Sequence, residues 1–311
     1  MTIAIAGSGD LTRYLAEEFS AANIPLVILT RREKPHFNNI AGVTQKVVDF
    51  TSTSSLLSAL NESKATALLS TILTYDTDAF VTIHKNLISA AQQSTSVTRF
   101  IPSEYGVNVA DYPDQPAFYW DTREPIRQIL RQQTSLEWTI VSNGWIIDYI
   151  IPSKNRYMKD IGDAFFVNLA KSRMLIPGTG KEAVDVISAR ELARGLVMLL
   201  QAPAGSWEEY IYLSAEQVTG NKIAEMVRMR YPGVEFVVER VSLARLVYAV
   251  RDAKSDFERI DAEYKISTCS GASGLEQTKV QEHRGRYFRG LRFRTVSEIL
   301  DAVERDPEVI V

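Results

Sequence analysis

Two glycines near the start of the chain are spaced as they are in phosphate-binding turns. Gly7 and Gly9 follow the apolar run Thr2–Ala6, which suits a buried parallel strand, and they precede a helical pattern of apolar residues. Gly7 permits the tight turn between strand and helix. Gly9 lets backbone N–H groups approach a pyrophosphate at the positive end of the helix. Thr12 stands where the usual fingerprint has a third glycine, so the motif is degraded. Its place between a strand and a helix still predicts a nucleotide-binding unit rather than a purely structural turn.

Two arginines follow the next apolar run, Pro25–Thr30, which we expect to be the second strand. Sites for NAD usually carry Asp or Glu at this place, whereas an arginine accommodates the 2′-phosphate of NADP. Arg31 and Arg32 occupy the place here, and a guanidinium can bind a phosphate through two parallel charge-assisted hydrogen bonds. The alternative is that both are solvated loop residues. The sequence therefore favours NADP(H) over NAD.

Alternating strand and helix patterns must position these residues. The expected strands are Thr2–Ala6, Pro25–Thr30, Val43–Phe50, Ala65–Ser70, Thr98–Ile101 and Trp138–Ser142, with helices between them at Thr51–Leu60, Thr77–Gln93 and Phe118–Gln133. This alternation predicts an α/β fold, a Rossmann-like doubly wound parallel sheet with right-handed crossovers. The carboxyl ends of its strands would border the cofactor.

Beyond Asn143 the pattern changes to short strand-like pieces and helices. We therefore expect two domains, an NADP(H)-binding Rossmann domain over residues 1–150 and a smaller α/β substrate domain over residues 151–311. A segment near 184–215 is expected to return to the first domain. The stretch Cys269–Glu276, rich in glycine, serine and alanine, is interpreted as a mobile loop.

Composition excludes several classes of partner. The 311 residues carry a formal net charge of −3, which gives no sign of a nucleic-acid partner. The single cysteine, Cys269, rules out an internal disulfide and fits a reducing compartment. No run approaches the roughly 18 apolar residues that span a bilayer, and the N-terminus lacks the pattern of a signal peptide. The three histidines are too scattered for a metal site. We expect a cytoplasmic monomer or homodimer that binds a small molecule and neither nucleic acid, membrane nor metal.

Four segments together resemble the NmrA-like and isoflavone-reductase-like branch of the atypical short-chain dehydrogenases/reductases. They are Ile3–Leu11, Arg31-Arg32, Val184-Asp185-Val186 and Arg99–Gly106, whose F-x-P-S-E-[FY]-G pattern is the most specific. The resemblance covers most of the chain. It implies a Rossmann fold that binds NADPH, with a variable C-terminal substrate domain. Members of the family are NADPH-dependent reductases of small aromatic natural products, or redox-sensing regulators.

The resemblance also implies which residues contact the cofactor. The expected contacts are Gly7, Gly9 and Leu11 at the pyrophosphate, Arg31 and Arg32 at the 2′-phosphate, Asp49 and Phe50 at the adenine, and Ser70, Thr71 and Ile72 at the nicotinamide ribose, with Asp10, Pro102 and Ser103 as further cofactor contacts.

An arginine replaces the lysine that reductases of this family carry as their proposed general acid/base. Their pattern is K-x-x-[IV]-R, and the matching piece here is Arg123-Glu124-Pro125-Ile126-Arg127. A lysine can be tuned to exchange a proton near neutral pH, but a guanidinium stays protonated. Arg123 could hold a ribose hydroxyl or stabilise an oxyanion, and it is a poor proton shuttle. Lys154, the nearest lysine, is an alternative acid, although exposed lysines are usually solvated.

Tyr119 lies one helical turn before Arg123, which is similar to the Y-x-x-x-K pair of other short-chain dehydrogenases with arginine in place of lysine. An adjacent cation would lower its pKa, so Tyr119 is a candidate acid, unless Phe118–Trp120 is simply a packing face. Asp121 and Glu104 are further candidate acids.

Pro125 bears on the geometry of this segment. It disfavours helical geometry at the residue before it, so the helix either begins near Glu124 or kinks there. If it begins there, Phe118–Arg123 would be loop residues that face the substrate.

Aromatic residues lie just past the sixth strand, where ligands bind in such sheets. The candidate substrate contacts are Trp145, Tyr149 and Tyr157, together with Tyr105 and Trp120. Aromatic side chains there suit a flat or hydrophobic substrate.

Three functions fit these residues. The first is an NADP(H)-dependent oxidoreductase that acts on an aromatic or polycyclic small molecule in secondary metabolism. The replacement of lysine by Arg123 motivates the second, a non-redox isomerase or cyclase that keeps NADP(H) as a structural element. The third is an NADP(H)-sensing regulatory protein without turnover, since a fold alone does not fix function.

Overall fold

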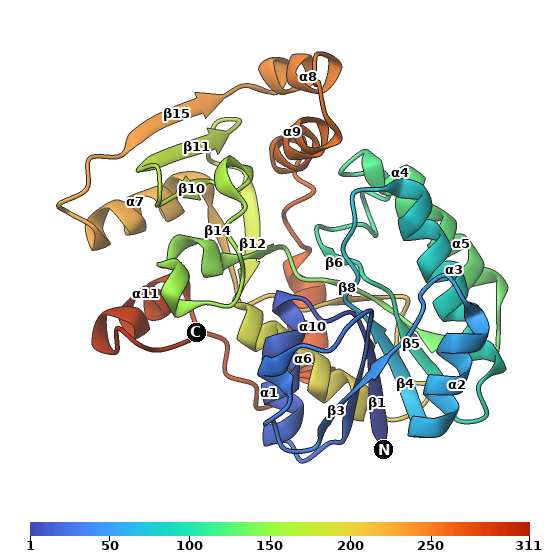
Figure 1. Ribbon diagram of the computed structural model, residues 1–311. Coiled ribbons are helices and arrows are strands. Elements are labelled where there is room, and N and C mark those ends of the chain that lie inside the picture. Colours follow the sequence, from blue (N-terminus) through green and yellow to red (C-terminus); the bar gives the residue numbers. More distant parts are fainter. The chain divides into compact units, whose positions relative to one another are not determined.

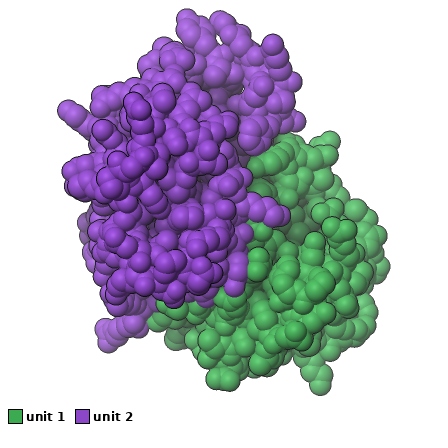
Figure 2. Space-filling model, turned by 60° about the vertical axis from the view of Figure 1, so that its left-hand side comes forward, with its two compact units in different colours: residues 1–104, 120–141, 193–211 green, residues 105–119, 142–192, 212–311 purple.

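The computed structural model describes residues 1–311, and the chain divides into two compact units. The first comprises residues 1–104, 120–141 and 193–211, and the second comprises residues 105–119, 142–192 and 212–311 (Figure 2, green and purple). The division differs from the expected boundary at residue 150, because residues 105–119 and 142–150 group with the second unit. The segment that groups with the first unit is 193–211, shorter than the expected 184–215.

The first unit is built on a six-stranded sheet in the order β3-β2-β1-β4-β5-β7, with every neighbouring pair parallel (Figure 1). Its strands are β1 (Thr2–Ala6), β2 (Leu26–Thr30), β3 (Val43–Val47), β4 (Ala65–Ser70), β5 (Arg99–Ile101) and β7 (Glu137–Trp138). The winding runs one way from β1 to β3 and the other way from β4 to β7. This confirms the Rossmann-like doubly wound sheet and places its switch point between β1 and β4, where such sheets bind ligands.

Apolar burial explains why these segments form this sheet. The four residues Ile3–Ala6 of β1 and the central residues of β2 are fully buried, as expected for strands covered on both faces. Each large apolar side chain that is buried contributes about 1.5–3 kcal/mol relative to exposure. Short polar side chains start the helices: Ser52 accepts a hydrogen bond from the N–H of Ser55, and Asp76 accepts one from the N–H of Ala79.

Helices connect the strands. They are α1 (Asp10–Ala21), α2 (Thr53–Ser63), α3 (Thr77–Gln93), α4 (Phe118–Thr122), α5 (Glu124–Gln132) and α6 (Ala189–Gln201), with the 3₁₀ helix η1 (Pro35–Phe37). The expected sixth strand is split in two. Glu137–Trp138 ends the parallel sheet as β7, while β8 (Ile140–Ser142) lies in a three-stranded sheet of order β13-β8-β6, with β6 (Tyr105–Gly106) and β13 (Tyr210–Tyr212).

The second unit contains two small sheets and five helices of nine residues or more besides the start of α6. One sheet has the order β14-β12-β9 and the other β10-β11-β15. The strands are β9 (Trp145–Ile146), β10 (Val167–Asn168), β11 (Arg173–Pro177), β12 (Ala183–Ile187), β14 (Glu216–Thr219) and β15 (Val237–Val241). The helices are α7 (Gly220–Arg230), α8 (Leu243–Arg251), α9 (Asp256–Cys269), α10 (Gln277–Tyr287) and α11 (Val296–Arg305), with the 3₁₀ helices η2 (Ile147–Ile150), η3 (Ser153–Asn155) and η4 (Gly162–Ala164).

The structure contradicts the interpretation of Cys269–Glu276 as a mobile loop. Ala272 and Ser273 are fully buried, and the N–H of Leu275 donates to the buried carboxylate of Asp185 at 2.7 Å. The N–H of Asp185 in turn donates to the carbonyl of Ser273 at 2.9 Å, and the carbonyl of Ala272 accepts from Asn108 at 2.8 Å. Small residues are required here because the turn packs closely against its neighbours. A loose loop has a similar composition, so composition alone does not distinguish the two.

None of the helices is both long and apolar enough to cross a lipid bilayer.

Candidate active site

The turn between β1 and α1 depends on glycine at residue 7. Gly7 has a φ of 114°, a conformation that side chains rarely adopt, and a Cβ there would lie 2.6 Å from the hydroxyl oxygen of Thr71. Thr71 follows β4, and its N–H donates to the carbonyl of Ala6 at 2.8 Å. The turn is therefore pressed against the end of β4 at the switch point of the sheet.

Thr12, in the place of the third glycine, is buried beneath this turn. Its hydroxyl donates to the carbonyl of Gly7 at 3.1 Å and lies 2.9 Å from the hydroxyl of Thr71. The side chain of Thr12, at the position of the missing third glycine, thus links the turn to the end of β4. Its hydroxyl forms these contacts inside the protein.

The start of α1 fits a pyrophosphate. Gly9 is the residue that precedes the helix and has no side chain to cap it, and a Cβ at Gly9 would meet nothing within 4 Å. Uncapped N–H groups with open space before them can bind an anion. Asp10 and Leu11, in the first turn, are both half-buried.

Cationic side chains gather beyond β2. Arg31 and Arg32 are exposed, and the hydroxyl of Thr30 holds their turn by donating to the carbonyl of Arg32 at 2.7 Å. The hydroxyl of Thr30 also lies 2.9 Å from that of Ser8, which ties this turn to the glycine turn.

Sequence reasoning missed two residues at this cationic region, the cation Arg13 and the imidazole of His36. Burial lowers the pKa of His36, and the charges of Arg13 and Lys34 lower it further. The side chains of Arg13, Lys34 and His36 therefore lie close together, and the two cations disfavour protonation of the imidazole. The position of Arg13 in the first turn of the helix after the glycines was the available signal.

The two residues expected at the adenine have structural contacts. Asp49 is exposed and accepts from the N–H and the hydroxyl of Thr51 at 2.8 and 2.7 Å, and these hydrogen bonds lower its pKa. Phe50 packs in the core between the sheet and its helices. The ring of Phe50 is therefore a buried support beneath the loop that Asp49 shapes.

The ends of β4 and β5 meet around a histidine that the sequence did not single out. The expected contacts here are Ser70, which is buried, Thr71, Ile72 and Ser103, which are half-buried, and Pro102, which is buried. The hydroxyl of Ser70 lies 3.0 Å from Nε2 of His84, and the N–H of Ser103 donates to the same nitrogen at 3.4 Å. His84 is fully buried in α3.

Arg123 precedes α5 and is buried against an aromatic ring. Its guanidinium carbon lies 3.8 Å from the ring centroid of Phe80, and the residue is 5% exposed. The first alternative for Pro125 is confirmed, because α5 begins at Glu124 with Pro125 in its first turn. The expectation that Phe118–Arg123 would then be a loop is wrong, since Phe118–Thr122 forms the short helix α4.

Glu104 is bound within a buried ion pair. Arg127 is fully buried, and its Nε donates to the two carboxylate oxygens of Glu104 at 3.1 and 3.3 Å. A second Arg127 nitrogen donates to Glu124 at 3.2 Å. The carboxylate is thus engaged by a fully buried guanidinium, which favours a structural role for Glu104.

The candidate acids on α4 differ in exposure. Tyr119 is buried, with its ring edge-on to those of Phe118 and Tyr264 at 4.9 and 6.5 Å, and a Cβ at Gly106 would lie 3.2 Å from its hydroxyl oxygen. On the same helix, the candidate substrate contact Trp120 is 57% exposed, and the candidate acid Asp121 is also exposed. Tyr119 is thus the candidate acid on this helix that lies among aromatic side chains.

An aromatic cluster forms inside the second unit. The Trp145 ring lies 5.6 Å from each of the rings of Phe165, Phe166 and Tyr264, and Tyr149 lies 5.4 Å from Phe165. The indole N–H of Trp145 donates to the hydroxyl of Ser273 at 3.1 Å, so the buried turn before α10 orients this ring.

The remaining predicted residues lie at other places. Tyr157 is half-buried after η3, and Tyr105 is half-buried in β6, where burial of the phenol raises its pKa well above the usual range. Lys154 is exposed and forms an ion pair with Glu308 at 2.9 Å. Burial raises the pKa of Cys269 to about 11, which makes its thiol unreactive.

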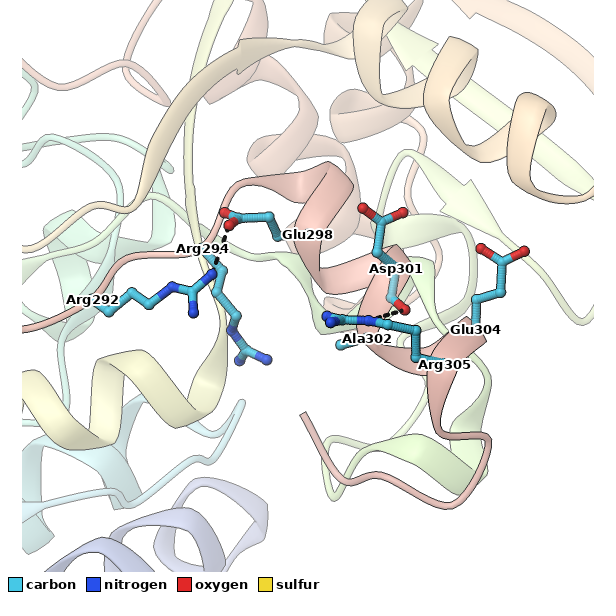
Figure 3. Close-up of a pocket in the computed structure, with 7 residues that line it drawn as sticks. All are labelled: Arg292, Arg294, Glu298, Asp301, Ala302, Glu304 and Arg305. Carbon is cyan, nitrogen blue, oxygen red and sulfur yellow. Dashed lines mark hydrogen bonds and ion pairs between the residues drawn. The ribbon is translucent and has the colours of Figure 1, made fainter.

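Two hollows in the second unit contain none of the predicted residues. The larger, of about 600 Å³, is lined almost entirely by charged side chains around α11, and Figure 3 shows Arg292 directed at Glu298, 2.9 Å away. The smaller, of about 400 Å³, is bordered by β11, β15, α8 and α9.

Comparison with known proteins identifies the family to which this architecture belongs. The family model described as the NmrA-like family matches residues 1–299. The chain belongs to the NmrA-like family. Two proteins named oxidoreductase swnR, from Arthroderma benhamiae and Metarhizium robertsii, are each 42% identical to it over 100% of both chains. This whole-length kinship identifies the chain as an oxidoreductase by class.

A solved structure shares the fold. Leucoanthocyanidin reductase from Vitis vinifera, in its binary complex with NADPH, superimposes with a TM-score of 0.73 over 97% of this chain and 99% of the reductase, at 16% identity. The resemblance predicted from the four sequence segments is confirmed.

Proposed function

We propose that this NmrA-like chain uses NADP(H) to reduce an aromatic or polycyclic small molecule, as a step of secondary metabolism. The observation that carries the proposal is the start of α1, where Gly9 supplies no capping side chain and leaves an open approach that fits a pyrophosphate. Arg31 and Arg32 follow the neighbouring strand, where a 2′-phosphate would lie. The NADPH bound by leucoanthocyanidin reductase, which has the same fold, supports the choice of cofactor.

The bound nicotinamide would supply or accept a hydride, and the protein would orient it. The half-buried residues Thr71, Ile72 and Ser103 would border the nicotinamide half at the ends of β4 and β5. The Thr12–Thr71 contact would hold the pyrophosphate turn and the ribose-binding end of β4 at a fixed separation.

The aromatic cluster around Trp145 favours a flat, apolar substrate. Trp145 and Phe165 are buried in the core of the second unit and Tyr264 packs against them, so this cluster would form an apolar wall beneath a planar substrate, and its aromatic pairs add about 0.5–1.5 kcal/mol each beyond simple burial. The Ser273 hydroxyl fixes the indole, so this wall would be pre-organised.

The proton that accompanies the hydride would not come from Arg123. A guanidinium remains protonated at neutral pH, and this one is committed to the ring of Phe80. Arg123 would instead add a fixed positive charge that favours an oxyanion. Tyr119 or water would then provide the proton.

The test is a turnover assay with purified protein, saturating NADPH and a panel of aromatic ketones, quinones and cyclic imines. Loss of the reduced-nicotinamide absorbance together with formation of reduced product would support the proposal. Product formed without consumption of NADPH would establish the non-redox isomerase or cyclase. Tight NADPH binding with no turnover of any panel member would favour the regulatory function.

A further inference from the structure

His84 has hydrogen bonds that define its protonation. Its Nδ1 lies 2.9 Å from the carbonyl oxygen of Phe80, which can only accept, so Nδ1 carries the hydrogen. Burial lowers the pKa of His84 to about 3, with the charge of Arg123 adding to the effect and the Phe80 hydrogen bond opposing it. The ring is therefore neutral, and Nε2 is an acceptor.

The accepting nitrogen joins two strand ends. Ser70 is the last residue of β4, and its hydroxyl donates to Nε2 at 3.0 Å. Ser103 follows β5, and its backbone N–H points at the same nitrogen at 3.4 Å. The Ser70 oxygen also lies 3.4 Å from the N–H of Ile72, so the turn after β4 is fixed from below. A single imidazole thus supports both backbone segments.

The imidazole is itself held in place by an aromatic stack. The rings of His84 and Phe80 lie 4.0 Å apart at 27°, and the guanidinium of Arg123 lies 3.8 Å from the centroid of the same Phe80 ring. The residue that stands in the place of the family's lysine therefore belongs to the assembly that supports His84.

We propose that His84 is a positioning residue for the nicotinamide half of the cofactor. It acts through backbone, by fixing Ser70–Ile72 at the end of β4 and Ser103 after β5. The half-buried residues of these segments would meet the nicotinamide ribose and ring. The inference rests on the proposed placement of the nicotinamide at these strand ends.

The test compares two ligands that differ only in the nicotinamide end. NADPH and 2′-phospho-ADP share the adenine, its ribose with the 2′-phosphate, and the pyrophosphate, but only NADPH carries the nicotinamide ribose and ring. His84→Phe keeps the stacked ring and removes both nitrogens, whereas His84→Gln keeps one donor and one acceptor. The dissociation constants of both ligands are measured for each protein by isothermal titration.

We expect His84→Phe to weaken NADPH binding about tenfold, the effect of about one lost hydrogen-bonding arrangement, and to change 2′-phospho-ADP binding by less than about twofold. His84→Gln should stay within about threefold of wild type for both ligands. An equal loss for both ligands, or no loss for NADPH, would overturn the role of His84. Equal affinity of the wild-type protein for the two ligands would overturn the nicotinamide placement itself, and the two failures are thereby distinguished.

Two further variants guard against a folding defect. Ser70→Ala removes one hydroxyl, and it should weaken NADPH binding selectively while adding little to His84→Phe, because the two residues act as one unit. His283 is a matched control, since it is buried in the second unit and its Nδ1 accepts from the N–H of Tyr212 at 2.8 Å. His283→Phe should leave the ratio of the two affinities unchanged. A shifted ratio in this control would overturn the specific role of His84.

Discussion

The hydroxyl groups of Thr12 and Thr71 lie 2.9 Å apart, one in the first turn of α1 and the other just after β4. They belong to residues 59 positions apart in the sequence, and they link the phosphate turn to the strand end at the switch point of the sheet. The departure from the usual three-glycine fingerprint is thus compensated by a second threonine.

Removal of the Thr12 hydroxyl should loosen this turn. We expect Thr12→Ala to weaken NADPH binding about fivefold and to cost about 1 kcal/mol of unfolding free energy, the usual size of one buried hydrogen bond. Thr12→Ser keeps the hydroxyl and should bind NADPH within about twofold of wild type. Titration of the three proteins with NADPH checks this. Equal binding by the alanine variant and wild type would show that the contact with Thr71 does not position the turn.

The arginines after β2 should determine the preference for a phosphorylated cofactor. Replacement of Arg31 and Arg32 together by alanine should weaken NADPH binding at least about tenfold and leave NADH binding within about twofold, because each charge-assisted hydrogen bond contributes about 1.5–3 kcal/mol. Arg228, an exposed arginine of α7, provides the control substitution. A variant that loses both cofactors equally would contradict the assignment.

A substitution of Glu104 distinguishes a structural role of this residue from a catalytic one. Glu104→Gln leaves Arg127 buried without its full counter-charge, so we expect a loss of about 3 kcal/mol in unfolding free energy, measured by urea denaturation. Glu308→Gln disrupts the exposed pair with Lys154 and should cost less than about 1 kcal/mol. If Glu104→Gln keeps its stability but loses all turnover, Glu104 is the acid.

The neutral state of His84 predicts a dependence of stability on pH. Its pKa is about 3 in the folded protein and near 6.5 in the unfolded chain, so the unfolded chain binds more protons between these values. Stability should therefore fall as the pH drops below about 6.5, by about 1.4 kcal/mol per pH unit at most from this residue. Thermal unfolding of wild type and His84→Gln at pH 7 and pH 5 measures this, and the variant should show the smaller loss. An equal loss of thermal stability in the two proteins between pH 7 and pH 5 would mean that protonation of His84 does not cause the pH dependence.

Arg123→Lys tests whether the missing lysine limits the reaction. If Tyr119 or water provides the proton, as we propose, the substitution should change turnover by less than about tenfold, with the pH profile of turnover as a second readout. A gain of about a hundredfold would indicate a scaffold that had lost reductase chemistry. That result would favour the regulatory or non-redox functions.

Local patterns predicted the parallel sheet well. The buried strands β1, β2 and β4 are short apolar runs, and the turn chemistry at Gly7 is visible in the residue types alone. The roles of Thr12 and His84 were not predictable in this way, because their partners Thr71 and Ser103 are brought near only by the folded sheet.

Composition gave a wrong prediction for the turn before α10. Gly271, Ala272 and Ser273 suggested a loose segment, yet their small side chains allow close packing against Asn108 and Asp185. The helices α9 and α10 are largely polar, so a pattern of apolar residues does not reveal them. Their inward faces are defined by tertiary contacts, such as those of Tyr264 and His283.

The chain passes between its two units several times, since residues 105–119 and 142–192 interrupt the first unit and residues 193–211 complete it. A fragment that ends at residue 150 would therefore lack a part of the nucleotide-binding unit and carry strands without their partners. Neither unit can be inherited, duplicated or exchanged as one continuous stretch of gene. The two units therefore have to change together, through substitutions in the separate segments from which each is built.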